Sequence, residues 1–178
     1  MHCWLDLQEV AKMPKNQTLD EFYSTFREEV LCASDTETSG WTTEDFLTNV
    51  MMEYLEEAGE VTDPVICPFR GYGLQMNAYA ISEDCESVDI FVSIYSESDR
   101  PRSVSQADID AAIKRAIQLY HKAINDLYTA FQKDNDTYEF AITLHQNKDN
   151  IKYVRICALT NGLVKPIALK NITIGGAE

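Results

Sequence analysis

The spacing of apolar residues changes period along this chain, and few folds accommodate that change. Between residues 18 and 58, apolar side chains recur at every third or fourth position, as on one face of a helix. Between residues 74 and 95 they alternate with polar side chains, as in a strand with two different faces. Helical spacing returns after residue 105. This order predicts an α/β domain in which one sheet is covered by helices.

Two helices are predicted before the strands, over residues 18–34 and 42–58. Each begins with a Thr that is followed three residues later by Glu or Asp, a pattern typical of a capping box. The second helix carries an unbroken apolar stripe and is followed by Gly59, a residue type that commonly ends helices. We therefore expect two amphipathic helices in succession.

Two strands are predicted next, over residues 74–80 and 88–95, and the polar turn between them favours a hairpin. The stretch before them contains Pro64 and Pro68 and is interpreted as a turn-rich loop. The remaining elements are a long helix over 105–131, a short helix over 136–147, a strand over 151–160 and a short strand within 167–174. The long helix exceeds what a small core can cover, so we expect one of its ends either to project or to bind something.

These elements fit one domain, since 178 residues is a common length for a chain with a single core. We expect residues 1–17 to form an N-terminal arm and residues 18–178 to form the single α/β domain. The order α-α-β-β-α-α-β is that of a restriction-endonuclease-like core, in which a mixed sheet is flanked by helices. The active site of such a core is therefore the first to test against this sequence.

Nucleases with that core hold Mg²⁺ between carboxylates and place a Lys near the metal-bound water. They need an acid on the first strand of the hairpin and an acid-x-Lys pair on the second. Here the corresponding positions are Asn77 on the first strand and Ser93 and Tyr95 on the second. Because neither a carboxylate nor a Lys stands there, we predict a degenerate core with no catalytic residues and no bound metal.

Two acids elsewhere leave an alternative open. Glu57 lies near the end of the second predicted helix, and Asp89 is the only acid within a predicted strand. In the alternative these two residues join Asn77 to hold Mg²⁺. Otherwise Glu57 belongs to a solvated helix face and Asp89 to a cross-strand pair.

Other catalytic patterns are missing from the sequence. The five cysteines lack metal-site spacing, and the three histidines belong to no recognisable nucleophile motif. The odd number of cysteines and the lack of a secretory leader favour a reducing compartment, so we expect a cytoplasmic protein. No apolar run approaches the ~18 residues that cross a bilayer, so no membrane partner is expected.

The net charge of −14 is unevenly distributed. Residues 1–100 carry 5 basic and 21 acidic side chains, whereas residues 101–178 carry 10 and 8. An acidic chain is poorly suited to bare nucleic acid, because Lys and Arg supply most of the affinity for phosphates. We expect a protein partner or self-association instead, with the acidic half serving either as solvated surface or to steer a basic partner.

Four segments together resemble a known family. They are similar to the N-terminal domain of abortive-infection phage-resistance (AIPR) proteins, and they are residues 56–61 (EEAGEV), 73–79 (GLQMNAY), 88–93 (VDIFVS) and the later strand and turn over 151–162. The resemblance implies a nuclease-like fold in a bacterial antiphage protein, of which this chain is the N-terminal part. The chain departs from the family at Asn77-Ala78, where the family has an acid followed by Gly.

Two functions from different classes follow. The first is a non-catalytic interaction or scaffold domain of an antiphage protein, which predicts no dependence on metal. The alternative is a degenerate metal-dependent nuclease-like domain that acts on nucleic acid through Mg²⁺, held by Glu57, Asn77 and Asp89. The alternative requires these three side chains to lie within ligand distance of one another.

Overall fold

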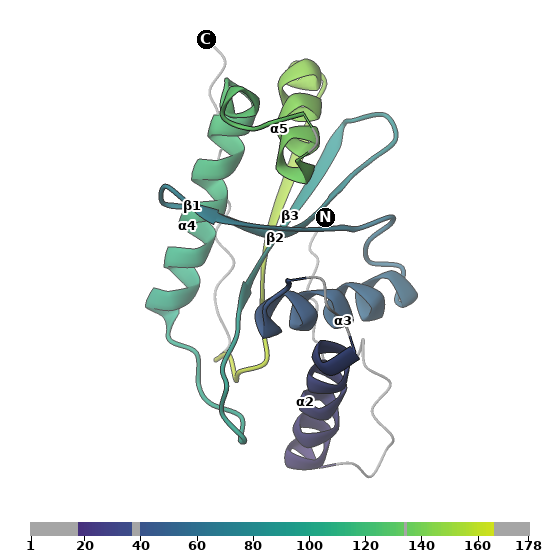
Figure 1. The fold of residues 1–178 in the computed structure, drawn as a ribbon, viewed down its shortest axis with the longest axis vertical. Coiled ribbons are helices and arrows are strands. Elements are labelled where there is room, and N and C mark those ends of the chain that lie inside the picture. Colours follow the sequence, from purple (N-terminus) through teal and green to yellow (C-terminus); the bar gives the residue numbers. More distant parts are fainter. Residues whose placement is uncertain (1–17, 37–39, 134, 166–178) are drawn as a thin grey trace.

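The computed structural model describes residues 18–36, 40–133 and 135–165, and it shows an α/β fold built on a four-stranded mixed sheet (Figure 1). The sheet has the strand order β1-β2-β3-β4. In chain order the elements are α2 (Leu19–Thr36), α3 (Thr43–Glu57), β1 (Val65–Gly71), β2 (Leu74–Ile81), β3 (Ser87–Ile94), α4 (Gln106–Ala123), the 3-10 helix η1 (Leu127–Ala130), α5 (Asp136–Asn147) and β4 (Tyr153–Thr160).

The sheet combines two kinds of pairing. β1 pairs antiparallel with β2, and β2 pairs antiparallel with β3, so the predicted hairpin between β2 and β3 is confirmed. β4 lies parallel to β3 in unbroken register from Ser87↔Tyr153 to Ile94↔Thr160. A parallel pair needs a crossover connection, and here α4, η1 and α5 supply it. The sheet is therefore mixed, as predicted.

The core has two apolar clusters, one on each face of the sheet. Val88, Ile90 and Val92 of β3 pack with α4 and α5, whereas Phe91 of the same strand packs with α2 and α3. Alternate residues of a strand point to opposite faces, so the helices lie in two layers with the sheet between them. In Figure 1, α2 and α3 (purple and blue) are stacked at the end of the molecule away from α5.

The predicted starts of both early helices are confirmed. In α2 the Thr18 amide donates to Glu21 Oε2 at 2.8 Å, and the Glu21 amide donates to Thr18 Oγ1 at 3.3 Å. These backbone and side-chain hydrogen bonds hold the pKa of Glu21 below its ordinary value. In α3 the Thr42 amide donates to Asp45 Oδ2 at 2.8 Å. Both N-termini are thus closed by the side chains that the sequence indicated.

The turn-rich loop predicted before β2 is wrong, because residues 65–71 form the edge strand β1. The register between β1 and β2 shifts by one residue between Ile66 and Phe69, which places Pro68 in a β-bulge. A bulge on an edge strand tolerates Pro, since no ladder hydrogen bond from its nitrogen is needed there. Pro68 therefore lies within a strand, although its presence had favoured a loop.

The long helix predicted over residues 105–131 is also wrong, because α4 ends at Ala123 and η1 follows it. Just past the end of α4, Asn125 Nδ2 donates to the His121 carbonyl at 2.6 Å, so a side chain occupies one of the last helical acceptors. Leu127 is buried in the same cluster as α4, so the chain folds back onto the core and no end projects.

The short helix over 136–147 is confirmed, and the last strand begins at Tyr153, two residues later than predicted. The predicted arm (1–17) and the predicted strand within 167–174 lie outside the described residues. No helix in the described part of the chain combines the length and the hydropathy that a membrane crossing needs.

Candidate functional site

Strand β2 separates from β3 at Asn77. The two strands pair from Ile81↔Val88 to Ala78↔Phe91, and the ladder stops there. The side-chain alternation of β2 also breaks at this point: Met76 packs in the cluster under α4, whereas Ala78 packs in the cluster under α3. The regular alternation expected from the sequence therefore does not hold through β2, since Leu74 and Met76 face one cluster and Ala78 and Ala80 the other. The break leaves backbone groups of β3 in need of other partners.

Two amide side chains of β2 replace the missing ladder. Asn77 Oδ1 accepts from the Ser93 amide at 2.9 Å and from Gln75 Nε2 at 3.3 Å. Gln75 Nε2 also donates to the Ser93 carbonyl at 3.2 Å. Both backbone groups of Ser93 are thus satisfied by side chains, as buried backbone groups must be.

A glutamate from α3 reaches the same place. Glu44 Oε1 accepts from Asn77 Nδ2 at 3.1 Å and from Arg70 Nη2 at 3.1 Å. Glu44 lies in the first turn of α3, where a negative charge also favours the helix dipole. Arg70 comes from β1, so this single carboxylate connects a helix with two strands.

Two more contacts complete the connection. Thr48 Oγ1 lies 2.7 Å from Ser93 Oγ and donates to the Glu44 carbonyl at 2.8 Å. Arg115 of α4 donates from Nε to Gln75 Oε1 at 2.9 Å. We call these connected side chains the polar network: Glu44, Thr48, Arg70, Gln75, Asn77, Ser93 and Arg115.

The centre of the polar network is buried. Gln75, Asn77 and Ser93 are 1%, 4% and 1% exposed, and Thr48 is fully buried. Buried polar groups are costly unless each one is hydrogen-bonded, and a fully connected set of them also fixes one arrangement of the surrounding elements. The polar network therefore holds α3, α4 and β1 to the point where β2 and β3 separate.

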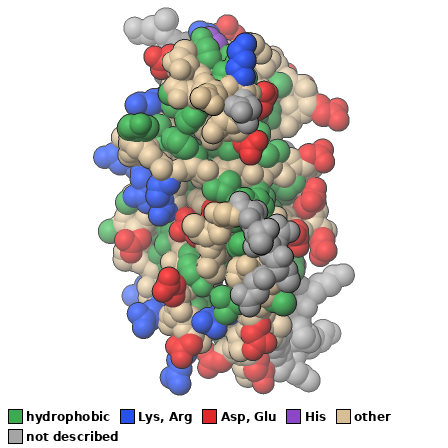
Figure 2. Space-filling model, viewed as in Figure 1, with side chains coloured by type: hydrophobic (Ala, Val, Ile, Leu, Met, Phe, Trp, Pro, Cys, Tyr) green, Lys and Arg blue, Asp and Glu red, His purple; other side chains and the backbone are tan. Residues whose placement is uncertain are grey.

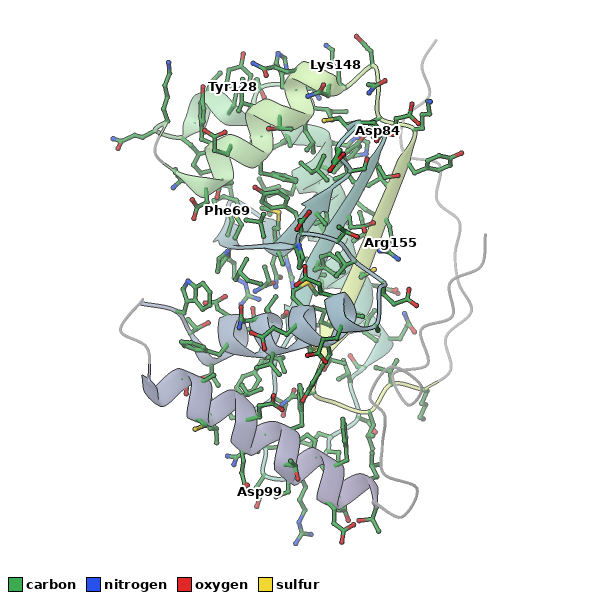
Figure 3. The ribbon with its side chains drawn as sticks, turned by 90° about the vertical axis from the view of Figure 1, so that its right-hand side faces the viewer. Phe69, Asp84, Asp99, Tyr128, Lys148 and Arg155 are labelled. Carbon is green, nitrogen blue, oxygen red and sulfur yellow. The ribbon has the colours of Figure 1, made fainter. Side chains whose placement is uncertain are left out.

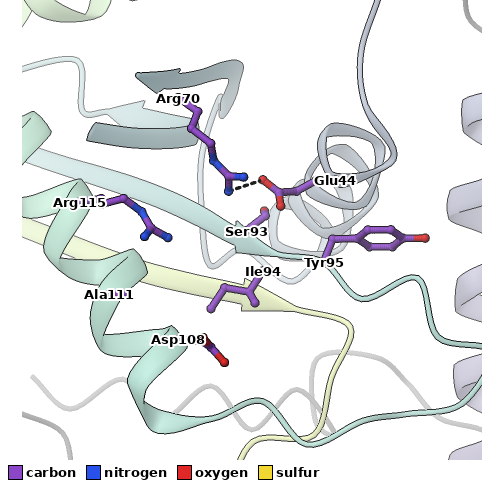
Figure 4. Close-up of a pocket in the computed structure, with 8 residues that line it drawn as sticks. All are labelled: Glu44, Arg70, Ser93, Ile94, Tyr95, Asp108, Ala111 and Arg115. Carbon is purple, nitrogen blue, oxygen red and sulfur yellow. Dashed lines mark hydrogen bonds and ion pairs between the residues drawn. The ribbon is translucent and has the colours of Figure 1, made fainter. Parts of the chain in front are cut away.

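Two small cavities lie against the polar network, and the Arg70–Glu44 ion pair contributes to the walls of both. One cavity, of about 180 Å³, is lined by Ser93, Tyr95 and Arg115 as well as the ion pair (Figure 4). The other, of about 220 Å³, lies beside Gln75 and Asn77. Both volumes suit a small chemical group better than a whole nucleotide.

The structure brings together three of the positions singled out from the sequence. Asn77 and Ser93 are hydrogen-bonded, and Tyr95 lines the cavity above Ser93. Glu57 is exposed at the far end of α3, about 20 Å along the helix from Glu44. It therefore lies far from Asn77.

Asp89 has a partner of its own. Arg155 of β4 donates from Nη2 to Asp89 Oδ2 at 2.6 Å and from Nε to Asp89 Oδ1 at 2.9 Å. Arg155 also donates to the Glu60 carbonyl at 2.9 Å, and it lies at the sheet edge in Figure 3. Asp89 is four residues from Ser93, or about 13 Å along β3. Glu57, Asn77 and Asp89 are thus at three separate places on the fold.

The sequence reasoning missed five members of the polar network: Glu44, Thr48, Arg70, Gln75 and Arg115. Arg70 was missed because β1 was interpreted as a loop. Glu44 follows the Thr at the start of α3 and was hidden beside the capping residue Asp45. The sequence did contain a signal for Glu44. Asp45 alone completes the capping box with Thr42, so the carboxylate of the neighbouring Glu44 is available for a contact with the sheet.

The polar network is poorly suited to a divalent cation. Glu44 is its single carboxylate, and the Arg70 guanidinium beside it supplies the positive charge that a metal would otherwise provide. Within the ranges that the structure describes, no group of three or more His, Cys, Asp and Glu side chains could hold a metal ion. The donor set around Asn77 is rich in amides and hydroxyls that are already bonded to one another.

Strand β1 carries a buried thiol, that of Cys67. Cys67 is 1% exposed, and burial raises the pKa of its thiol to about 11, against a smaller opposing effect of the hydrogen bond with Thr137. Sγ lies 3.7 Å from Thr137 Oγ1. A thiol with so high a pKa is protonated at neutral pH, so Cys67 serves as a packing residue.

These features define a class: an α/β domain with a mixed sheet, whose central strands separate around a buried network of amides, hydroxyls and one Arg–Glu pair. The family model for the abortive infection phage resistance protein N-terminal domain matches residues 47–178, and the chain belongs to this family. No curated protein and no solved structure gives a significant match to the chain. The match contains all four strands and the amide pair Gln75 and Asn77.

Proposed function

We propose that this chain is a non-catalytic interaction domain of a cytoplasmic abortive-infection protein, with the polar network as a structural centre. One observation carries the proposal. The carboxylate nearest the strand separation, Glu44, is engaged by Arg70 and by Asn77. A hydrolytic metal centre needs several carboxylate oxygens with room for water, and this arrangement offers one carboxylate whose charge is already balanced.

The surface charge supports a protein partner over nucleic acid. The helices α2 and α3 carry many of the acidic side chains of the first hundred residues. In Figure 2 the acidic side chains are most numerous along one side of the molecule and the basic ones along the other. An uneven surface of this kind orients an approaching protein, whereas a net charge of −14 repels a polyphosphate.

A cleavage assay tests the proposal. Supercoiled plasmid DNA, single-stranded DNA and RNA are incubated with the purified chain in Mg²⁺ or Mn²⁺ and compared with Glu44→Gln, which keeps the shape of the side chain and removes its charge. We expect the same background level of product from both proteins, because no group in the polar network activates water. Cleavage by the wild type that disappears in Glu44→Gln contradicts the proposal and supports the nuclease-like alternative.

A further inference from the structure

Arg115 is a half-buried cation without a counter-charge. It lies on α4 facing the 180 Å³ cavity, and no carboxylate oxygen in the described residues lies within 4.0 Å of its guanidinium. Its one side-chain hydrogen bond in that part of the chain runs from Nε to Gln75 Oε1. Charged groups withdrawn from water are normally paired, so the guanidinium of Arg115 remains able to bind an anion.

The orientation of Arg115 is fixed by its neighbours. Gln75 is 1% exposed and is itself held by Ser93 and Asn77, so the bond to Nε anchors the guanidinium at one edge. The two Nη groups are then directed into the cavity, and Figure 4 shows the guanidinium pointing toward its centre. A fixed guanidinium with two free N–H groups on one edge matches a planar, bidentate acceptor.

A second guanidinium, that of Arg70 on β1, also lines the cavity. Arg70 points into the same space in Figure 4, and its side chain is 61% exposed, so solvent and solutes reach it. Two carboxylates, Glu44 and Asp108, also line the cavity. Asp108 is bound by Ser105 Oγ at 2.6 Å. The wall therefore carries two positive and two negative groups. Because Glu44 is already paired with Arg70, Arg115 is the cation left to bind a ligand, and one such charge suits a monoanionic group better than a dianion.

We infer that this cavity binds a carboxylate of a protein partner, an acidic side chain or a chain terminus, through Arg115 with Arg70 alongside. The inference rests on the proposed interaction function and gives it a site. Two features favour a carboxylate over a phosphodiester: the cavity holds one small group, and the net charge of −14 repels the neighbouring phosphates of a nucleic acid strand.

Nuclear magnetic resonance of the arginine Nε–Hε groups tests the inference. The probes are N-acetylglutamate amide, which carries one carboxylate, and dimethyl phosphate, which carries one phosphodiester charge. We expect N-acetylglutamate amide to shift the Arg115 and Arg70 Nε–Hε signals saturably and to bind more tightly than dimethyl phosphate. In the Arg115 variants the Arg70 signal reports the affinity. Arg115→Gln is expected to weaken binding by about tenfold or more, since it removes a charge-assisted pair.

Two further variants separate binding from folding. Lys114→Gln removes the same charge from the adjacent, exposed position of α4 and is expected to leave the affinity within about twofold. Arg115→Lys keeps the charge and a donor for Gln75 and is expected to bind with intermediate affinity. The inference is overturned by the absence of a saturable shift, by tighter binding of dimethyl phosphate, or by equal losses in Arg115→Gln and Lys114→Gln. None of these outcomes produces nucleic acid cleavage, so failure of this site remains distinct from failure of the proposed function.

Discussion

Asn77→Asp is expected to lower the free energy of unfolding at pH 7 by about 2–3 kcal/mol. The substitution keeps the size of the side chain and the acceptor for the Ser93 amide. It removes the Nδ2 donor that lies 3.1 Å from Glu44 Oε1 and puts a carboxylate oxygen there instead. Because position 77 is 4% exposed, water cannot screen the two negative charges well.

The loss is expected to depend on pH. Burial and the neighbouring carboxylate both raise the pKa of the introduced carboxyl in the folded state above its unfolded value. The folded state then binds the proton more tightly, so the variant is closest to wild type at low pH and loses stability as the pH rises through the raised pKa. Urea unfolding between pH 4 and pH 8 measures this trend.

Asn49→Asp is the matched control. Asn49 Nδ2 donates to Glu53 Oε1 at 2.8 Å, so the substitution removes the same kind of bond and creates the same kind of charge pair on an exposed helix face. There the expected loss is about 0.5 kcal/mol or less. Equal losses at positions 49 and 77, or a loss at 77 that does not grow with pH, contradict a buried polar network.

Phe140→Ala is expected to destabilise the fold by about 3–5 kcal/mol. Phe140 lies in α5 with no exposed surface, and its ring centroid is 4.9 Å from that of Tyr79 on β2. Burial also raises the pKa of Tyr79 to about 12. Removing the ring leaves a cavity between α5 and the sheet that the rigid strands cannot close.

Urea unfolding followed by circular dichroism measures the loss. Tyr72→Ala is the control, because Tyr72 is 93% exposed at the turn between β1 and β2, and its change is expected to stay within about 0.5 kcal/mol. Phe140→Leu retains most of the volume and is expected to lose less, which keeps the comparison measurable if Phe140→Ala fails to fold. A loss below about 1 kcal/mol in Phe140→Ala contradicts the packing of α5 on the sheet.

Local signals made much of the fold predictable. The capping residues Thr18 and Thr42 and the apolar stripes of the helices act within a few residues of sequence, and the starts of α2 and α3 follow from them. The alternation in β3 predicted its strand for the same reason. Errors arose where tertiary context overrides local preference, as at Pro68, which an edge bulge accommodates.

The candidate site was only partly predictable, since its residues are brought together by the fold. Asn77 and Ser93 were identified by register along the two hairpin strands, and they do meet. Glu44 bonds to Asn77 across 33 positions of sequence, and Arg115 bonds to Gln75 across 40. No periodicity encodes such contacts, because they depend on how α3 and α4 dock on opposite faces of the sheet.

A calorimetric titration of the purified chain with Mn²⁺, alongside Glu44→Gln, tests most directly whether the polar network is structural. The carboxylate of Glu44 is balanced by Arg70, so we predict heats of dilution alone for both proteins. Saturable binding heat in the wild type that is lost in Glu44→Gln would show that a metal displaces Arg70 from Glu44, and would contradict a non-catalytic domain.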